Sequence, residues 1–285
     1  MSGDKRLVGV AALLGTVLLW GSSFPGIKVV VDTVDPMTYV WLRSLIAAIV
    51  LAPYVVLGVR RGWDLGDSVR GGLATGIAFA LGLWLQGWGT RYTTASNSAF
   101  ITGLNVVFVH IYVAVAGRRY GWRLASSLAL SIAGLYLLTS PGGGFGLGDA
   151  LVLLGAIMWA AQIILIDKYR PRDPIAFTYA ELVPSTLFLV PALLIYGPPR
   201  ITPGVMLVIA YLAVACADGA FILQAYGQRY VDPAATAMIF LLEPVFATVF
   251  SVILLHEHVT FPQIIGMAMI LSALYISVRE NTGTA

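Results

Sequence analysis

The chain has 285 residues, of which 59% are hydrophobic and 11% are charged, and its formal net charge is +3. A water-soluble domain is about 45–50% apolar and about 25% charged, so this composition excludes an ordinary soluble protein. Apolar runs of about 20 residues, the length at which a helix crosses a bilayer, recur along the chain. The alternating pattern of an outer-membrane barrel does not occur. The composition therefore predicts an all-α integral membrane protein whose surroundings are the lipid bilayer.

Division of the chain at charged and turn-forming stretches predicts ten transmembrane helices. They cover residues 7–30, 37–58, 69–89, 95–116, 122–139, 149–167, 175–196, 204–227, 233–254 and 261–278. Lys5 and Arg6 precede the first apolar run as in a signal peptide, but no small-residue cleavage site follows them. We therefore interpret this run as the first spanning helix. The single cysteine, Cys216, excludes an intrachain disulfide and is expected to pack as a small hydrophobic side chain.

Basic residues are distributed unevenly between the two sides of the membrane. With the N-terminus placed in the cytoplasm, and with Lys28 and Arg43 left out as lying within spans, thirteen basic residues lie on the cytoplasmic side and two, Arg91 and Arg200, lie on the other. Lysine and arginine are in excess in cytoplasmic loops. This distribution predicts that both termini are cytoplasmic and that the number of spans is even.

The sequence contains an internal repeat. LQGWGTRY at residues 85–92 returns as LQAYGQRY at residues 223–230, which is 138 residues later. The repeat predicts two five-helix halves, residues 1–140 and 149–285, joined by a glycine-rich linker at 141–148. An odd number of helices inverts the second half relative to the first. Inverted repeats of this kind suit alternating access, with the substrate site at the interface between them.

At this point the chain resembles a known group of proteins. LLWGSSFPGIK at the first span, the two five-helix halves and the Glu243-Pro244 pair in the ninth span are similar to the drug/metabolite transporter superfamily. The EamA-type ten-helix exporters, and among them the YddG-like bacterial aromatic amino acid exporters, are the most similar group. The resemblance implies a transporter of the bacterial inner membrane that exports amino acids or similar metabolites. It also implies that the first, third, fourth, sixth, eighth and ninth spans surround a central cavity.

Polar and aromatic side chains at helical spacing form stripes along these six spans. The candidate substrate-binding residues are Trp20, Ser23, Phe79, Leu83, Gln86, Ser98, Thr102, Asn105, Trp159, Gln162, Phe221, Gln224, Thr236, Phe240 and Glu243. Rings combined with uncharged hydrogen-bonding groups suit a small amphipathic solute such as an amino acid. The alternative for each ring is that it only packs between helices.

Charged residues within the spans are costly in a bilayer and therefore candidates for function. Glu243 could bind a substrate ammonium group or a coupling proton; alternatively it bonds backbone groups that are freed beside Pro244. Asp218 is a second coupling candidate, or it pairs with a neighbouring helix. Arg43 and Glu181 occupy equivalent positions in spans that the resemblance places at the periphery. We expect these two to be structural, by snorkelling to the interface or pairing locally.

Two prolines are predicted to bend their helices. Pro25, within a glycine- and serine-rich stretch, and Pro244 both remove a backbone donor, and we expect hinges at both positions. Lys28 is expected to snorkel to the outer interface rather than to bind substrate. His256 and His258 in an outer loop are a weak metal signal, so we expect a solvated turn and no metal site.

Several functional classes lack their sequence signatures. The chain contains no phosphate-binding loop, no potassium-selectivity filter, no nucleophile elbow and no redox cysteine pair. We therefore predict a transporter without a cofactor, not an enzyme, which acts on a small molecule and not on nucleic acid. An integral-membrane enzyme acting on lipid or sugar groups, a channel or scaffold, and a carrier for a nucleoside, sugar or drug stay as alternatives. The sequence leaves coupling, direction and oligomeric state open, and a monomer fits it.

Overall fold

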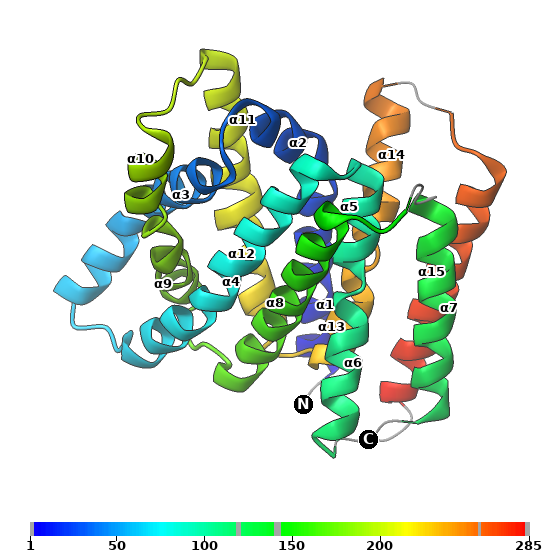
Figure 1. Ribbon diagram of the computed structural model, residues 1–285. Coiled ribbons are helices and arrows are strands. Elements are labelled where there is room, and N and C mark those ends of the chain that lie inside the picture. Colours follow the sequence, from blue (N-terminus) through cyan, green and yellow to red (C-terminus); the bar gives the residue numbers. More distant parts are fainter. Residues whose placement is uncertain (1–2, 118–120, 140–143, 256–257, 283–285) are drawn as a thin grey trace.

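The structure, a computed structural model, describes residues 3–117, 121–139, 144–255 and 258–282, and every regular element in these ranges is a helix (Figure 1). The first half of the chain forms α1 (Gly3–Gly21), α2 (Ser23–Thr33), α3 (Pro36–Arg60), α4 (Gly66–Tyr92), α5 (Ala95–Gly103), α6 (Asn105–Val115) and α7 (Trp122–Thr139). The second half forms α8 (Leu147–Tyr169), α9 (Pro174–Thr186), α10 (Leu189–Tyr196), α11 (Pro203–Ala213), the π-helical turn η1 (Val214–Gly219), α12 (Ala220–Gly227), α13 (Pro233–Phe240), α14 (Glu243–Leu255) and α15 (Phe261–Thr282).

Aspartate-proline pairs begin three of these helices. Asp35, Asp173 and Asp232 each accept a hydrogen bond from the backbone N–H three residues later, at 2.8–2.9 Å. The proline that follows occupies the first helical position, where no backbone donor is needed. Local sequence therefore sets where α3, α9 and α13 begin.

Most of the helices are suited to a membrane. Among the described residues, eight helical segments are long and apolar enough to cross a bilayer, and the bent pair of α1 and α2 makes a ninth if it counts as one span. The apolar part of α15, Phe261–Ile276, is shorter. An all-helical membrane protein is thus confirmed, whereas the count of ten spans and the division into two inverted repeats stay predictions. Residues 141–143 of the predicted linker lie outside the described residues.

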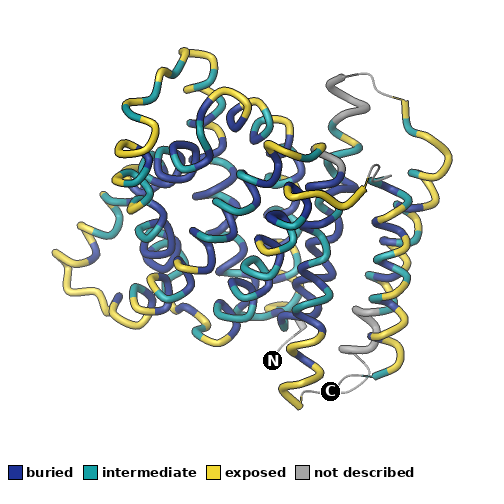
Figure 2. The backbone as a smooth tube through the Cα atoms, in the orientation of Figure 1, coloured by how far each residue is buried: buried dark blue, intermediate teal, exposed yellow. Residues whose placement is uncertain are grey.

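The surface of the helical bundle is apolar and its interior carries polar groups. Val115 is 83% exposed and Leu194 is 81% exposed, whereas Gln162 and Glu181 are each 1% exposed. Figure 2 shows the buried residues gathered in the middle of the bundle and the exposed ones along its outer faces and loops. Exposed apolar surface of this extent is the surface that lipid covers in a membrane protein.

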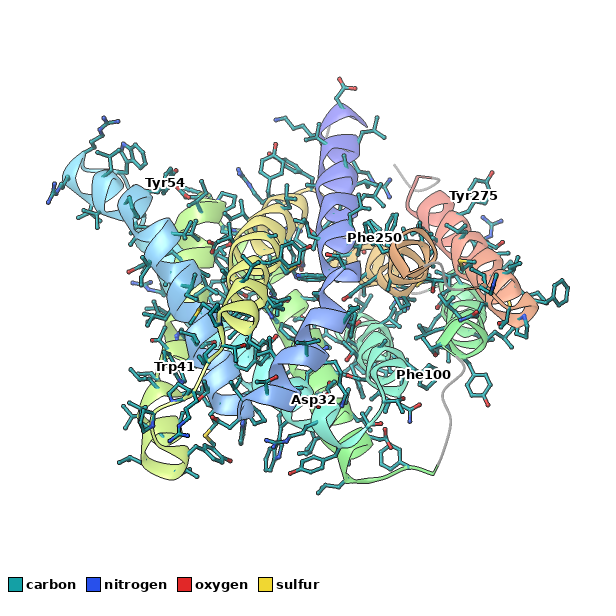
Figure 3. The ribbon with its side chains drawn as sticks, turned by 90° about the horizontal axis from the view of Figure 1, so that it is seen from above. Asp32, Trp41, Tyr54, Phe100, Phe250 and Tyr275 are labelled. Atoms are coloured by element: carbon teal, nitrogen blue, oxygen red, sulfur yellow. The ribbon has the colours of Figure 1, made fainter. Side chains whose placement is uncertain are left out.

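The bundle is widest between α3 and α15. Seen from above, α3 with Tyr54 and α15 with Tyr275 lie on opposite sides of the molecule, and α1 lies between them (Figure 3). α1 begins and α15 ends on the lower side of Figure 1, whereas α8 begins on the upper side. The start of α1 and the end of α15 therefore lie on the same side of the bundle.

Two pairs of helices approach each other at glycines. A Cβ atom on Gly9 of α1 would lie 3.0 Å from the carbonyl oxygen of Gly227 in α12, and one on Gly148 of α8 would lie 2.9 Å from the carbonyl oxygen of Gly89 in α4. Gly148 follows Gly9 by 139 residues and Gly227 follows Gly89 by 138, which are the offsets of the repeat. Only glycine permits these backbones to come so close.

Two helices are interrupted four residues before a proline. α1 ends at Gly21, four residues before Pro25, and α13 ends at Phe240, four residues before Pro244. A proline ring clashes with the carbonyl group four residues earlier, so the helix stops there. α1 and α2 meet at 41°. Breaks are present at both expected positions, and their use as hinges stays a prediction.

We expect Pro25→Ala to reduce the bend between α1 and α2, because alanine restores the missing donor and removes the ring clash. Val8 and Val29 are 49% and 50% exposed and can carry spin labels. A smaller bend would appear as a longer distance between the two labels in pulsed electron paramagnetic resonance. The same labels on protein that keeps Pro25 provide the control. An unchanged distance would show that packing around the break, and not the proline, holds the bend.

Candidate central cavity

A cavity of about 50 Å³ lies in the interior of the bundle, which is enough for a few water molecules at ~10–15 Å³ each. Its lining comes from both halves of the chain. The lining residues are Trp20, Ser23, Phe24, Ile27, Arg43, Leu83, Gln86, Thr102, Asn105, Trp159, Gln162, Ile163, Phe221, Phe240 and Glu243. The structure therefore brings eleven of the fifteen candidate residues together. Phe24, Ile27, Arg43 and Ile163 were not among the candidates.

The remaining four candidates lie behind the lining or away from it. Phe79 is fully buried and its ring packs edge-on against those of Trp159 and Phe221, at centroid distances of 5.7 and 4.8 Å. Gln224 bonds to Gln162. Ser98 and Thr236 are buried, and neither contributes to the cavity wall.

Aromatic rings form a continuous cluster on one part of the wall. Trp20 contacts Phe221 and Phe240, each at a centroid distance of 5.0 Å, and Trp159 stacks on Phe221 at 6.1 Å. The indole nitrogen of Trp20 donates to the carbonyl oxygen of Cys216 at 3.1 Å. This hydrogen bond holds the indole ring of Trp20 in place between the rings of Phe221 and Phe240. An apolar body of a ligand could lie against these rings.

A chain of amide side chains leads away from the cavity on the side of the second half. Gln162 Nε2 donates to Glu181 Oε1 at 2.9 Å and to Gln224 Oε1 at 3.1 Å. Gln224 Nε2 returns a bond to Gln162 Oε1 and donates to Gln228 Oε1, both at 2.9 Å. Gln228 Nε2 ends the chain on the carbonyl oxygen of Ile163 at 2.8 Å. The chain joins α8, α9 and α12 through buried polar groups.

Hydroxyl groups form a shorter network on the side of the first half. Gln86 Nε2 donates to Thr102 Oγ1 at 3.1 Å, and the hydroxyls of Thr90 and Ser98 lie 2.7 Å apart. Lys28 donates to the carbonyl oxygen of Thr90 at 3.3 Å and pairs with Asp32 at 3.0 Å. With a third of its side chain exposed, Lys28 lies at the edge of the bundle and outside the cavity.

Of the two outcomes expected for Arg43 and Glu181, snorkelling to the interface is wrong, and bonding to neighbouring groups is what the structure has. Arg43 is 4% exposed and lines the cavity, and Glu181 is 1% exposed and bonds to Gln162. Both therefore point into the bundle. Arg43 is held there by Tyr39 of its own helix, α3, at 2.6 Å and by the carbonyl oxygens of Leu212 and Cys216, each at 3.1 Å.

The carboxylate groups of Asp218 and Glu243 differ in position. Asp218 is 4% exposed in η1, neither of its carboxylate oxygens has a hydrogen-bond partner, and it lies outside the cavity lining. Glu243 is the first residue of α14 and lines the cavity. Of the two coupling candidates, Glu243 is the one that a solute in the cavity would meet.

Irregular helical segments position several lining residues. α5 ends at Gly103 and α6 begins at Asn105, as α13 ends at Phe240 and α14 begins at Glu243. Asn105 and Glu243 are 138 residues apart, so the two breaks match. The η1 turn exposes carbonyl groups that a regular helix would use, and Trp20 and Arg43 both bond to that of Cys216. Turns of this kind are frequent at functional sites.

The described residues contain no group of three or more side chains suited to holding a metal ion. His256 and Glu257 of the weak metal motif lie outside the described residues. What the described cavity offers is one basic group, one acidic group, amide and hydroxyl groups, and a face of aromatic rings. It can hold a small polar molecule by hydrogen bonds and stacking.

Helices apolar and long enough to cross a bilayer enclose a polar and aromatic cavity, which is an arrangement that membrane transport proteins have. The sequence profile of the EamA-like transporter family matches residues 7–140 and again residues 146–279. The chain belongs to the EamA-like transporter family, and it is a membrane protein.

Individual relatives are similar over nearly the whole chain. An uncharacterized transporter of Archaeoglobus fulgidus is 33% identical over 277 residues, which cover 96% of this chain and 87% of the relative. The probable amino-acid metabolite efflux pump of Salmonella typhimurium is 28% identical over 308 residues, or 96% and 95% of the two chains. A solved crystal structure that is 15% identical superposes with a TM-score of 0.79 over 100% of both chains, which shows the same fold.

Proposed function

We propose that this protein exports amino acids, aromatic ones among them, or similar small metabolites by alternating access through the central cavity. The observation that carries the proposal is the composition of the cavity wall. Rings of Trp20, Phe221 and Phe240 lie beside hydrogen-bonding groups, a basic side chain, Arg43, and an acidic one, Glu243. Such a wall suits a solute with an apolar body and a polar, charged end.

Two relatives that are named as efflux pumps support export and an amino-acid substrate. Efflux pumps of Salmonella typhimurium and Escherichia coli that are named for amino-acid metabolites are each 28% identical to this chain. The twofold match of the family profile supports a division into two repeats, with a boundary in the glycine-rich linker. In the proposed orientation the protein lies in a bacterial inner membrane with both termini in the cytoplasm.

Purified protein in liposomes, supplied with a panel of labelled amino acids, tests the proposal. We expect uptake or counterflow of at least one member of the panel, while protein-free liposomes stay empty. No transport of any amino acid would contradict the proposed substrate. A nucleoside, sugar or drug in a second panel would then identify the alternative carrier.

We also propose that Glu243 carries a coupling proton, since its side chain lines the cavity. Glu243→Gln is expected to abolish transport that is driven by a proton gradient and to spare exchange of substrate for substrate. Asp218→Asn, which alters a carboxylate outside the lining, is the matched comparison. Uphill transport at the normal rate in Glu243→Gln would remove the coupling role.

A further inference from the structure

Arg43 is the one basic side chain among the described residues of the cavity wall. It comes from α3, which the family resemblance placed at the periphery, and it is 4% exposed. A buried guanidinium group is costly unless an anion or a set of hydrogen bonds compensates it. The partners of Arg43 therefore decide whether it is a structural group or a binding group.

The hydrogen bonds of Arg43 hold its position without neutralising its charge. Nε donates to the carbonyl oxygen of Leu212, Nη2 to that of Cys216, and Nη1 to the hydroxyl group of Tyr39. All three acceptors are uncharged. A guanidinium group has five N–H donors, so one N–H remains on each of the two terminal nitrogens. Two such donors match the two oxygens of a carboxylate.

No carboxylate of the described protein pairs with Arg43. The ion pairs between described residues are those of Lys28 with Asp32 and of Arg170 with Asp167. Asp218 interacts electrostatically with Arg43, but neither of its oxygens accepts a hydrogen bond. The positive charge at the cavity wall is therefore fixed in direction and available to an anionic group.

The acidic group of the same wall is Glu243. A solute that carries a carboxylate and an ammonium group would find the basic group for the first and the acidic group for the second, and its side chain would lie against the rings of Trp20 and Phe221. The indole nitrogen of Trp159, which is buried and has no acceptor, adds one more donor to the wall. This arrangement gives the carboxylate and the ammonium group of an amino acid separate receptors.

We infer that Arg43 is the carboxylate receptor of the cavity and makes the protein selective for solutes that bear a carboxylate. The inference rests on the proposed function, since it assumes that the substrate occupies this cavity. It predicts that the neutral amide of an amino acid, which keeps the ammonium group and the side chain, binds weakly.

Binding of matched acids and amides to the purified full-length protein tests the inference. Phenylalanine, leucine and threonine are compared with phenylalaninamide, leucinamide and threoninamide by calorimetric titration. We expect the acid that binds best to bind at least tenfold more tightly than its amide. In Arg43→Gln this ratio should fall to about one, chiefly through weaker binding of the acid. Arg43→Lys keeps the positive charge but loses the paired N–H donors of the guanidinium group, and it should give an intermediate ratio.

Arg123→Gln is the control, because it removes an exposed basic group far along the chain from the cavity wall, and we expect it to keep the ratio of the unaltered protein. Retained binding of the amide by Arg43→Gln shows that this variant is folded. If Arg43→Gln does not fold, the ratio of acid to amide affinity in Arg43→Lys tests the inference instead. An equal affinity for acid and amide in the unaltered protein, or an unchanged ratio in the folded Arg43 variants, overturns the inference alone. No binding of any probe overturns the proposed substrate as well.

Discussion

Gly72→Ala is expected to destabilise the protein more than substitution of a glycine at the surface. A Cβ atom on Gly72 of α4 would overlap the carbonyl oxygen of Phe177 in α9 and lie 2.8 Å from the Cβ atom of Ala180. Backbone atoms cannot rotate away, so the two helices must separate. Overpacking costs about 1–3 kcal/mol where side chains can adjust, and here we expect about 3 kcal/mol or more. By the usual scaling for large domains, this is a drop of roughly 6–12 °C in the melting temperature.

Thermal unfolding of purified protein in detergent measures this effect, with Gly204→Ala as the control. Gly204 lies in the first turn of α11 and a Cβ atom there would meet nothing within 4 Å. Alanine is a better helix former than glycine by about 1 kcal/mol, so the control is expected to be unchanged or more stable. A melting temperature of Gly72→Ala equal to that of Gly204→Ala would mean that α4 and α9 do not approach as the structure has them.

Gln162→Leu is expected to cost far more stability than Glu181→Leu, although the two side chains are partners. Gln162 donates to both Glu181 and Gln224 and accepts from Gln224. Its loss leaves a buried carboxylate and a buried amide without these bonds, at about 1–3 kcal/mol for each unsatisfied group and more for a charged one. Loss of Glu181 removes a carboxylate whose Oε2 atom already lacks a partner, while Gln162 keeps its bonds to Gln224.

The double variant Gln162→Leu/Glu181→Leu distinguishes this explanation from a simple loss of volume. Removal of both partners takes away the stranded carboxylate, so part of the stability lost in Gln162→Leu should return. The three variants are compared by thermal unfolding, and transport is measured in parallel because Gln162 lines the cavity. Equal losses in the two single variants, with additive loss in the double variant, would contradict the network.

The helix positions could be predicted from the sequence because the bilayer restricts the possible structures. Backbone groups in lipid must bond within their own segment, so an apolar run bounded by Asp-Pro caps and charged loops becomes a helix. The polar stripes also predicted that Gln86, Thr102 and Gln162 line the cavity, since helical spacing determines which side chains share a face. The helix positions needed only local sequence, whereas the choice of the six spans around the cavity also used the family resemblance.

Arg43 was misplaced because its setting depends on contacts between helices that are distant in sequence. Its partners Leu212 and Cys216 follow it by 169 and 173 residues, and the η1 turn that presents the Cys216 carbonyl group has no proline to mark it. The break after Gly103 likewise lacks the proline that marks the matching break before Pro244. The breaks before Pro25 and Pro244 could be predicted from those prolines. The break between α9 and α10 was missed although Pro184 and Pro191 flank it.

The contacts of Gly9 with Gly227 and of Gly148 with Gly89 have a consequence for the speed of a transport cycle. At these pairs the side chains of Leu13 and Val152 lie against glycines that have no side chain of their own, so little interdigitation has to be undone when the helices separate. In an alternating-access carrier, one such contact toward each end of the bundle would let that end open and close over a low barrier. Bulkier residues at either pair would slow the exchange between conformations, even if the substrate bound normally.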